Sequence, residues 1–385
     1  MEQTVYLDYN ATTPLDQRVL QTMMPYLTGQ FGNASSRQHA FGWVADEAVN
    51  IARKKVARLI GAGAEEIYFS SGATESVNLA IKGVYEAYQS ASSHMVCLAT
   101  EHKAVLDTYE YLGRRGAEIT VLTVGQDGIV DLELFAQSLR KDTLLASVML
   151  ANNETGVLQP IEAIAEICAA KNVLLFCDAT QAAGKIQVNV RSMNIPLLAL
   201  SAHKMYGPKG TGALYISRKN PRVSIVAQLH GGGHEGGKRS GTLNVPGIAG
   251  MGKAAELGLL EMDAAGTRLG LLRDEFENRL AAAIPGLKIN GNLQHRLPHV
   301  SNLAFPGVSA AEMMSRMPGL AIAAGSACSA ADLEPSHVLR AMGLSRPELN
   351  SSLRFSLGRM TTATEMDYAA NLVAGTWKKL SPVSI

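Results

Sequence analysis

A lysine follows an apolar segment that is typical of a buried strand. The segment spans residues 197–200 and leads through Ser201 and His203 to Lys204. A turn of glycine and proline follows at 207–210. A lysine at the mouth of a buried strand loses solvation, and its neutral amine can then bond covalently to a carbonyl carbon. A surface lysine beside a turn is the alternative interpretation, so the rest of the sequence has to decide between the two.

Polar residues also follow other predicted strands. Residues 70–76 contain Gly72 and lead into a helix, whose free N–H groups would bind an anion such as phosphate. His102 and Asn153 follow two further strands, although alone each is a structural histidine or a polar turn. Asp178 ends another strand, where it either caps the next helix or pairs with a cation such as a protonated pyridine nitrogen. Ligands of an open parallel sheet bind beyond the carboxyl ends of its strands, so we expect these residues to share one site with the lysine.

One of the four cysteines has surroundings unlike the other three. Cys328 lies among the small residues of 323–331, whereas Cys97, Cys168 and Cys177 lie in apolar runs and are predicted to be buried. A loop cysteine without a role is the alternative interpretation. Beside a cofactor site, a thiolate in such a loop could attack a substrate sulfur atom and carry it away. The spacing of the cysteines matches no metal site, and we expect none.

Strands and helices alternate along most of the sequence. The predicted strands are 67–69, 95–98, 119–124, 144–150, 173–177, 197–200 and 212–216. The predicted helices are 43–60, 76–84, 132–140, 161–170 and 254–283. This alternation predicts an α/β fold with a mostly parallel central sheet flanked by helices. From about residue 286 the pattern changes and predicts a smaller α+β domain.

Composition excludes several classes of function. Lys and Arg (35) nearly equal Asp and Glu (34), and the net charge of +1 argues against a direct nucleic-acid or membrane partner. Hydrophobic residues make up 47% of the 385 residues, which suits a large core. No apolar stretch approaches the roughly 18 residues of a membrane span. The N-terminus lacks the pattern of a secretory signal, and the few cysteines suit a reducing compartment, so we expect a cytoplasmic enzyme.

Several short segments carry a family resemblance. They are SGATES (71–76), TEHKAVL (100–106), NNETG (152–156), DATQ (178–181), SAHKMYGPKG (201–210), GGGHEGGKRSGT (231–242), GSAC (325–328) and LRFSLGR (353–359). With them the sequence resembles the NifS/IscS-type cysteine desulfurases, which are pyridoxal-phosphate enzymes of fold type I in the class V aminotransferase family. The resemblance, nearer to the housekeeping iron–sulfur branch, implies a large cofactor-binding domain at 15–260. It also implies a small domain, formed by 1–14 and 261–385, that carries the mobile loop of the catalytic cysteine.

The resemblance also implies a role for individual residues. Lys204 would bond to the aldehyde of pyridoxal 5′-phosphate, and His102 would stack on the pyridine ring and assist proton transfer. Asp178 would pair with the pyridine nitrogen, and Gln181 would hydrogen-bond the phenolic oxygen. The phosphate would be held by Ala73, Thr74, Ser201 and His203, and Thr242 would contact the phosphate of the neighbouring subunit in a homodimer. The substrate would be oriented by Asn33, Arg354 and Asn153, of which Asn153 also contacts the cofactor. Cys328 would take the sulfur.

The implied reaction converts L-cysteine to L-alanine. Lys204 would remove the α-proton, and Cys328 would take the sulfur as a persulfide. A sulfur-acceptor protein would then receive it for iron–sulfur cluster assembly, tRNA thiolation or DNA phosphorothioation. The sequence ends at Ile385, before the tail with which housekeeping members bind the iron–sulfur scaffold, so we expect a specialised acceptor.

Three alternatives remain at this point. A selenocysteine lyase or an aminotransferase would share the fold and the cofactor. A nucleotide-binding protein without enzymatic activity would use the glycine run at 231–237 as a phosphate cradle. That run lacks the Gly-Lys-Ser/Thr ending of a P-loop, which argues against the third alternative.

Overall fold

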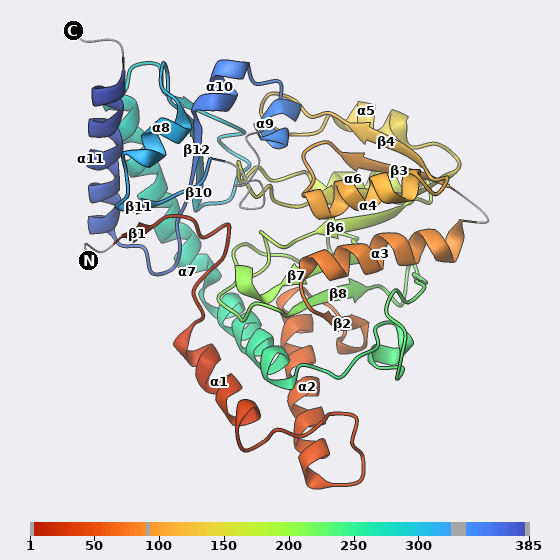
Figure 1. Ribbon diagram of the computed structural model, residues 1–385. Helices are drawn as coiled ribbons and strands as arrows, with labels where there is room; N and C mark the ends of the chain where they lie inside the picture. The colour runs from red at the N-terminus through yellow and green to blue at the C-terminus, as the bar shows by residue number, and fades with distance from the viewer. Residues whose placement is uncertain (1–3, 90–92, 325–335, 382–385) are drawn as a thin grey trace.

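A seven-stranded sheet forms the centre of the computed structural model, which describes residues 4–89, 93–324 and 336–381. In spatial order its strands are β2 (Ile67–Ser70), β8 (Gly212–Ile216), β7 (Leu197–Ser201), β6 (Leu174–Asp178), β5 (Thr143–Met149), β3 (His94–Leu98) and β4 (Glu118–Leu122). β8 runs antiparallel to both of its neighbours, and the other pairs are parallel. The prediction of a mostly parallel central sheet is therefore confirmed (Figure 1).

Helices cover both faces of this sheet, so its strands are buried on both sides. In β7 the side chains of Leu198 and Leu200 join the core on one face, and Leu197 and Ala199 join the core on the other. One core includes residues of α2 (Ala40–Leu59), α5 (Leu132–Ser138), α6 (Ile161–Ala170) and the first part of α7 (Val245–Ala283). The opposite core includes residues of α3 (Ala73–Tyr88) and α4 (Lys103–Gly113).

A second, smaller group of elements has a core of its own. It contains the antiparallel sheet β12 (Ser352–Ser356), β10 (Val300–Ala304) and β9 (Lys288–Ile289), and the parallel pair β1 (Val5–Tyr6) and β11 (Leu320–Ala321). The remaining helices are α1 (Gln17–Leu27), α8 (Ala310–Ser315), α9 (His337–Ala341), α10 (Arg346–Ser351) and α11 (Ala363–Leu380). Short 3₁₀ turns lie at Ala64–Glu66, Ala202–Lys204 and Glu235–Gly237.

The long helix α7 belongs to both groups of elements. Its first part, up to Leu257, packs in the core of the large sheet, and from Leu269 onward it packs in the smaller core. The two cores thus divide within α7, and the domain boundaries at 15–260 and 261–385 stay a prediction that agrees with this division.

The predicted start of this helix, at residue 254, is wrong by nine residues. The first turns are rich in glycine, which weakens a helical pattern in the sequence. Packing explains the glycines, because a Cβ atom at Gly252 would lie 2.6 Å from the Cα of Ala52 in α2. Close contact between α7 and α2 therefore outweighs the low helix propensity of these residues.

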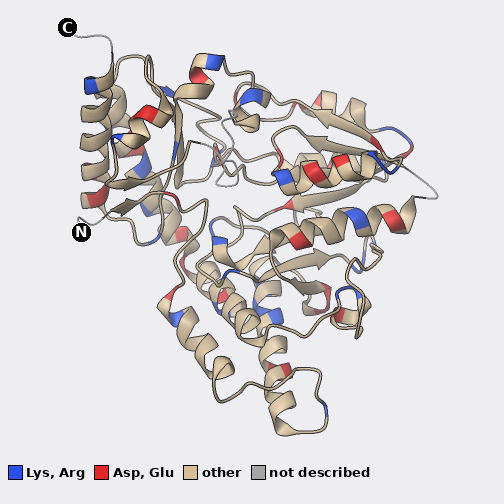
Figure 2. Cartoon of the chain, in the orientation of Figure 1, with Lys and Arg blue, Asp and Glu red and all other residues tan. Residues whose placement is uncertain are grey.

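Charged residues of both signs are interspersed along the described chain (Figure 2). Within the described segments, none of the helices combines the length and the apolar character that crossing a bilayer requires.

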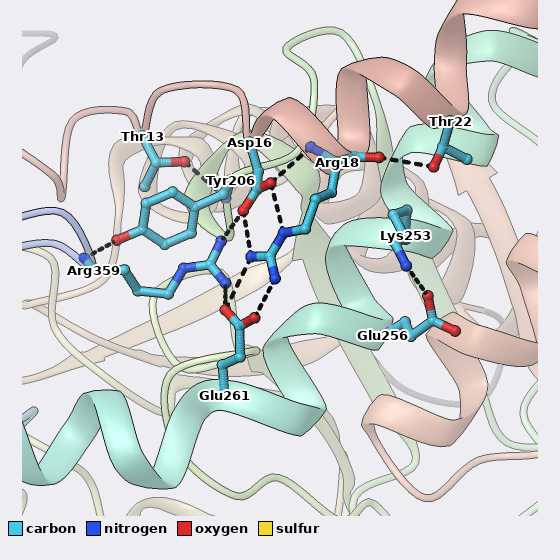
Figure 3. A network of polar contacts seen from close by, with 9 residues as sticks. All are labelled: Thr13, Asp16, Arg18, Thr22, Tyr206, Lys253, Glu256, Glu261 and Arg359. Carbon is cyan, nitrogen blue, oxygen red and sulfur yellow. Dashed lines mark hydrogen bonds and ion pairs between the residues drawn. The ribbon is translucent and has the colours of Figure 1, made fainter.

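Four charged side chains join α1, α7 and the segment that follows β12 (Figure 3). Arg18 contacts Asp16 at 2.8 Å and Glu261 at 2.5 Å. Arg359 contacts the same two carboxylates, at 3.1 Å for Asp16. The hydrogen bond from Arg18 is the main cause that lowers the pKa of Asp16 to about 2. The backbone of the same aspartate donates to the carbonyl of Tyr206 at 3.1 Å, so this network holds the turn that contains the predicted lysine.

Replacing Asp16 should therefore cost stability in a pH-dependent way. The folded-state pKa of about 2 lies below the ordinary 3.8, so the stabilisation is present above pH 4 and is lost as the pH falls toward 2. At pH 7 we expect Asp16→Asn to lower the free energy of unfolding by about 1–2 kcal/mol, a range reduced for solvent screening. Urea unfolding at several pH values measures this, with the exposed Asp263→Asn on α7 as control. A deficit that stayed constant down to pH 3 would contradict the account.

Candidate active site

Most of the predicted site residues surround one cavity at the carboxyl ends of the parallel strands. The cavity has a volume of about 510 Å³. Its lining includes Ala73, Thr74, His102, Asn153, Asp178, Gln181, Ser201, His203, Lys204 and Arg354. These residues come from both groups of elements. Arg354 lies on β12, whereas the others lie at or after the ends of strands of the large sheet, or at the start of the helix that follows such a strand. Segments far apart in the sequence thus meet where the strand-end argument expected them to meet.

Lys204 closes the 3₁₀ turn that follows β7. Its Nζ atom donates to the backbone carbonyl oxygens of Asn10 at 2.6 Å and Ala11 at 2.7 Å. Two residues later Tyr206 adopts a left-handed conformation (φ +66°), which is unfavourable for a residue with a side chain. The contacts of that tyrosine compensate, because its N–H donates to Thr13 Oγ1 at 2.8 Å and its hydroxyl accepts the backbone N–H of Arg359 at 2.6 Å. The course of the lysine turn is thus imposed by segments distant in sequence.

One part of the cavity lining, at the start of α3, is suited to an anion. The 16-residue helix α3 begins there at Ala73 with no side-chain cap, so the N–H groups of its first turn point out of the helix without intrahelical acceptors. The backbones of β8 and of the residue before α3 approach each other closely here, since a Cβ atom at Gly212 would lie 2.6 Å from the Cα of Gly72. Burial, and then the nearby lysines, lower the pKa of His203 to about 4. A negatively charged ligand would relieve this excess of donors and positive charge.

A carboxylate and an imidazole also line the cavity. Asp178 is buried at the end of β6, and its Oδ1 accepts the N–H of Thr180 at 2.9 Å. His102 caps α4, where its Nδ1 accepts the N–H of Ala104 at 3.0 Å. Burial lowers the pKa of His102, while the charge of Asp178 opposes that shift. The buried hydroxyl of Thr180 has no hydrogen-bond partner within the described residues, which leaves a polar atom for a ligand.

A buried arginine lines the cavity as well. Arg354 is only 1% exposed; it donates to the carbonyl of Asn153 at 2.8 Å and pairs with Asp8. Its Nε atom and the Oδ1 atom of Asn153 lack partners among the residues that the structure describes. A donor and an acceptor thus remain available beside the cavity, and a carboxylate is the ligand that a guanidinium prefers.

Several predicted residues lie elsewhere. Asn33 and Thr242 are exposed and do not line the cavity. Cys328 lies outside the described residues. Cys97, Cys168 and Cys177 are buried as predicted, and burial raises the pKa of each thiol. In the described part of the chain no group of His, Cys, Asp and Glu is placed to hold a metal ion.

The glycine run at 231–237 is used for internal contacts. Glu235 lies buried within it, pairs with Arg53 at 2.7 Å and accepts the backbone N–H of Phe69 at 2.7 Å. A carboxylate accepts hydrogen bonds but cannot donate them, so this side chain would not help to bind a nucleotide phosphate, which argues against the nucleotide-binding alternative.

Sequence reasoning missed the N-terminal part of the site. Asn10, Ala11 and Thr12 line the cavity, yet no role was expected of them. Their most direct contribution is the pair of carbonyl acceptors for Lys204, and backbone atoms leave no signature of residue type. The polar residues that follow β1, like those after the strands of the large sheet, were the one available signal.

Comparison with known proteins agrees with this geometry. The chain belongs to the aminotransferase class-V family, which it matches over residues 5–369 and whose members depend on pyridoxal phosphate. It is 53% identical over 384 residues to the cysteine desulfurase IscS of Anaeromyxobacter sp. strain Fw109-5, covering 100% of this chain and 95% of the relative. A solved structure of a NifS-like protein aligns with a TM-score of 0.90 and 35% identity over 97% of this chain and 99% of the other. SspA in complex with cysteine aligns with a TM-score of 0.82 and 35% identity over 93% and 100% of the two chains.

The buried position of Arg354 leads to a stability prediction. Arg354→Lys keeps the charge but cannot reach Asn153 and Asp8 with separate nitrogens of one planar group. We expect it to lower the free energy of unfolding by about 1–3 kcal/mol. Arg316→Lys, at an exposed arginine, is the matched control and should change it by less than about 0.5 kcal/mol. Equal stability of the two variants in urea unfolding would contradict the proposed contacts.

Proposed function

We propose that this protein is a pyridoxal-phosphate-dependent cysteine desulfurase, which converts L-cysteine to L-alanine and retains the sulfur as a persulfide on Cys328. One observation carries the proposal. A lysine amine, a buried carboxylate, an imidazole, an anion-binding helix start and a buried guanidinium line the same cavity. The similarity to cysteine desulfurases along the whole chain supports the same activity, and the SspA complex supports cysteine as the substrate.

The residues present fit pyridoxal phosphate. The helix start at Ala73 and Thr74, together with Ser201 and His203, would hold the phosphate. The cavity volume of about 510 Å³ lies within the usual range for ligand sites. Around the ring, Lys204 would bond to the aldehyde, Asp178 would pair with the pyridine nitrogen, Gln181 would hydrogen-bond the phenolic oxygen and His102 would stack on the face. When bound, the cofactor would supply an electron sink for the bonds at the substrate Cα.

Substrate orientation and sulfur transfer follow from the remaining groups. Arg354 and Asn153 would grip the cysteine carboxylate, which places the Cα hydrogen near the amine of Lys204. The lysine would remove that proton. The thiolate of Cys328 would then attack the substrate sulfur, so that an S–S bond forms as the Cβ–S bond breaks. The electron pair stays with the carbon, which takes up a proton and becomes the methyl group of alanine.

The active site is proposed to form in a homodimer. Asn33 and Thr242 lie outside the cavity of their own chain, as residues that serve the neighbouring subunit would. Two exposed aromatic side chains lie together near Asn33 in the sequence: Phe31, 70% exposed, and Phe41, 51% exposed, with ring centroids 5.4 Å apart. An exposed apolar cluster of this kind favours a protein interface. Beyond the dimer, the proposal includes a cytoplasmic acceptor protein that receives the sulfur for cluster assembly, tRNA thiolation or DNA phosphorothioation.

Two variants test the function. Lys204→Ala should lose both the cofactor absorbance and the production of alanine. Cys328→Ala should keep that absorbance but lose alanine production from cysteine by at least about 100-fold. The buried cysteine variant Cys168→Ala is the control and should keep its turnover. If Cys328→Ala turned over cysteine at the normal rate, the desulfurase mechanism would be excluded, and the same assay with selenocysteine tests the lyase alternative.

The phosphate site gives a separate prediction about protons. Burial and the nearby lysines lower the pKa of His203 to about 4, so its side chain is neutral at about pH 5.5 before the cofactor binds. A bound phosphate favours the charged imidazole and raises this pKa, so cofactor binding should take up a proton there. Calorimetry in two buffers of different ionisation enthalpy measures the uptake. His203→Gln should remove it and the exposed His295→Gln should not, whereas equal uptake in both variants would contradict the assignment.

A further inference from the structure

Asn10 makes hydrogen bonds with every one of its polar groups. Its carbonyl oxygen accepts from Lys204 Nζ at 2.6 Å and from Gln181 Nε2 at 3.0 Å. Its N–H donates to the hydroxyl of Ser356 at 3.0 Å. Its side chain, on a residue only 1% exposed, contacts the Asn153 carbonyl at 3.1 Å and His299 Nε2 at 3.1 Å. The residue therefore contacts both the large sheet and β12.

The orientation of the Asn10 side chain is determined by its partners. The carbonyl of Asn153 can only accept, so the amide nitrogen of Asn10 faces it and the amide oxygen faces His299. His299 must then donate from Nε2. Burial lowers the pKa of His299 well below its usual range, so the ring is neutral and carries its proton at that nitrogen. A rotated amide would leave two buried mismatches, and this conformation is accordingly well fixed.

Asn10 also links the two groups proposed to act on the substrate. The carbonyl of Asn153 accepts from Arg354 at 2.8 Å as well as from Asn10. The carbonyl of Asn10 in turn accepts from Lys204. Asn10 therefore connects the two groups: its side-chain amide shares the Asn153 carbonyl with the guanidinium, and its backbone carbonyl accepts from the amine.

We propose that Asn10 is a positioning residue that holds the Lys204 amine at the carbonyls of Asn10 and Ala11 whenever this lysine is not bonded to the cofactor. The inference rests on the proposed function, because it concerns the interval in which the substrate has displaced the lysine. An amine held at two carbonyl acceptors stays within the cavity and beside the substrate. Because Asn10 and Arg354 share the Asn153 carbonyl, the amine also keeps a fixed position relative to the Arg354 guanidinium, which is proposed to bind the substrate carboxylate.

A second buried asparagine offers a matched control. Asn290 is 9% exposed, and its amide donates to Asn302 at 2.8 Å and to Ser352 at 2.9 Å. It lies beside β10 and does not line the cavity. Asn290→Ala removes the same chemical group as Asn10→Ala, so it should disturb packing to a similar degree without affecting the lysine.

Acylation of individual lysines measures the proposal directly. The full-length protein is stripped of cofactor and treated briefly with acetic anhydride, and the modification of Lys204 is followed by peptide mass spectrometry. Lys171, whose amine also lies on two backbone carbonyls, serves as an internal reference. Asn10→Ala should accelerate acylation of Lys204 about fivefold, since the carbonyl that holds the amine is no longer fixed. Lys171 should react at an unchanged rate, and Asn290→Ala should leave both lysines unchanged.

His299→Leu provides a second route, because it removes the donor to Asn10 and leaves the asparagine in place. This variant should also increase the rate of acylation of Lys204, and it tests the proposal if Asn10→Ala does not fold. Unchanged acylation of Lys204 in the folded variants would overturn the proposal, and so would equal acceleration of Lys204 and Lys171. The measurement requires no turnover, so its failure is distinct from a failure of the desulfurase assay.

Discussion

Two cationic side chains line the same cavity, and each needs acceptors to replace the water it has lost. Lys204 finds them in the carbonyls of Asn10 and Ala11, and Arg354 finds them in Asp8 and the carbonyl of Asn153. Most of these acceptors lie in the N-terminal segment, which passes from β1 into the cavity. This segment joins the two groups of elements, because it contacts both β12 and the lysine turn.

The fold was largely predictable because its main determinants are local. Strands buried on both faces appear as continuous apolar runs, and each predicted strand of the large sheet is present with small shifts at its ends. The carboxyl ends of parallel strands lie at one edge, so residues such as His102 and Asp178 could be assigned to one site before the structure was known. The start of α7 was not predictable, since its glycines are explained only by contact with α2.

Long-range polar contacts account for most of what the sequence did not reveal. In the network of Asp16, Arg18, Glu261 and Arg359, two contacts join residues 243 and 343 positions apart, and nothing in that spacing indicates pairing. The burial of Arg354 was not predictable either, because the sequence of β12 is that of an ordinary strand with one charged residue. Contacts made by backbone carbonyls are still more difficult to predict, because every residue type has a backbone carbonyl. Such contacts nevertheless decide where the Lys204 amine lies.

The proposed chemistry depends on one reactive thiol. Cys97, Cys168 and Cys177 are buried with raised pKa values, so their thiolates are scarce and inaccessible to a substrate in the cavity. The most direct measurement is a single turnover of the cofactor-loaded protein with one equivalent of L-cysteine, analysed by peptide mass spectrometry without reductant. The account predicts that the peptide of Cys328 gains one sulfur atom in an amount equal to the alanine formed. Alanine without added sulfur on Cys328, or sulfur on another cysteine, would contradict it.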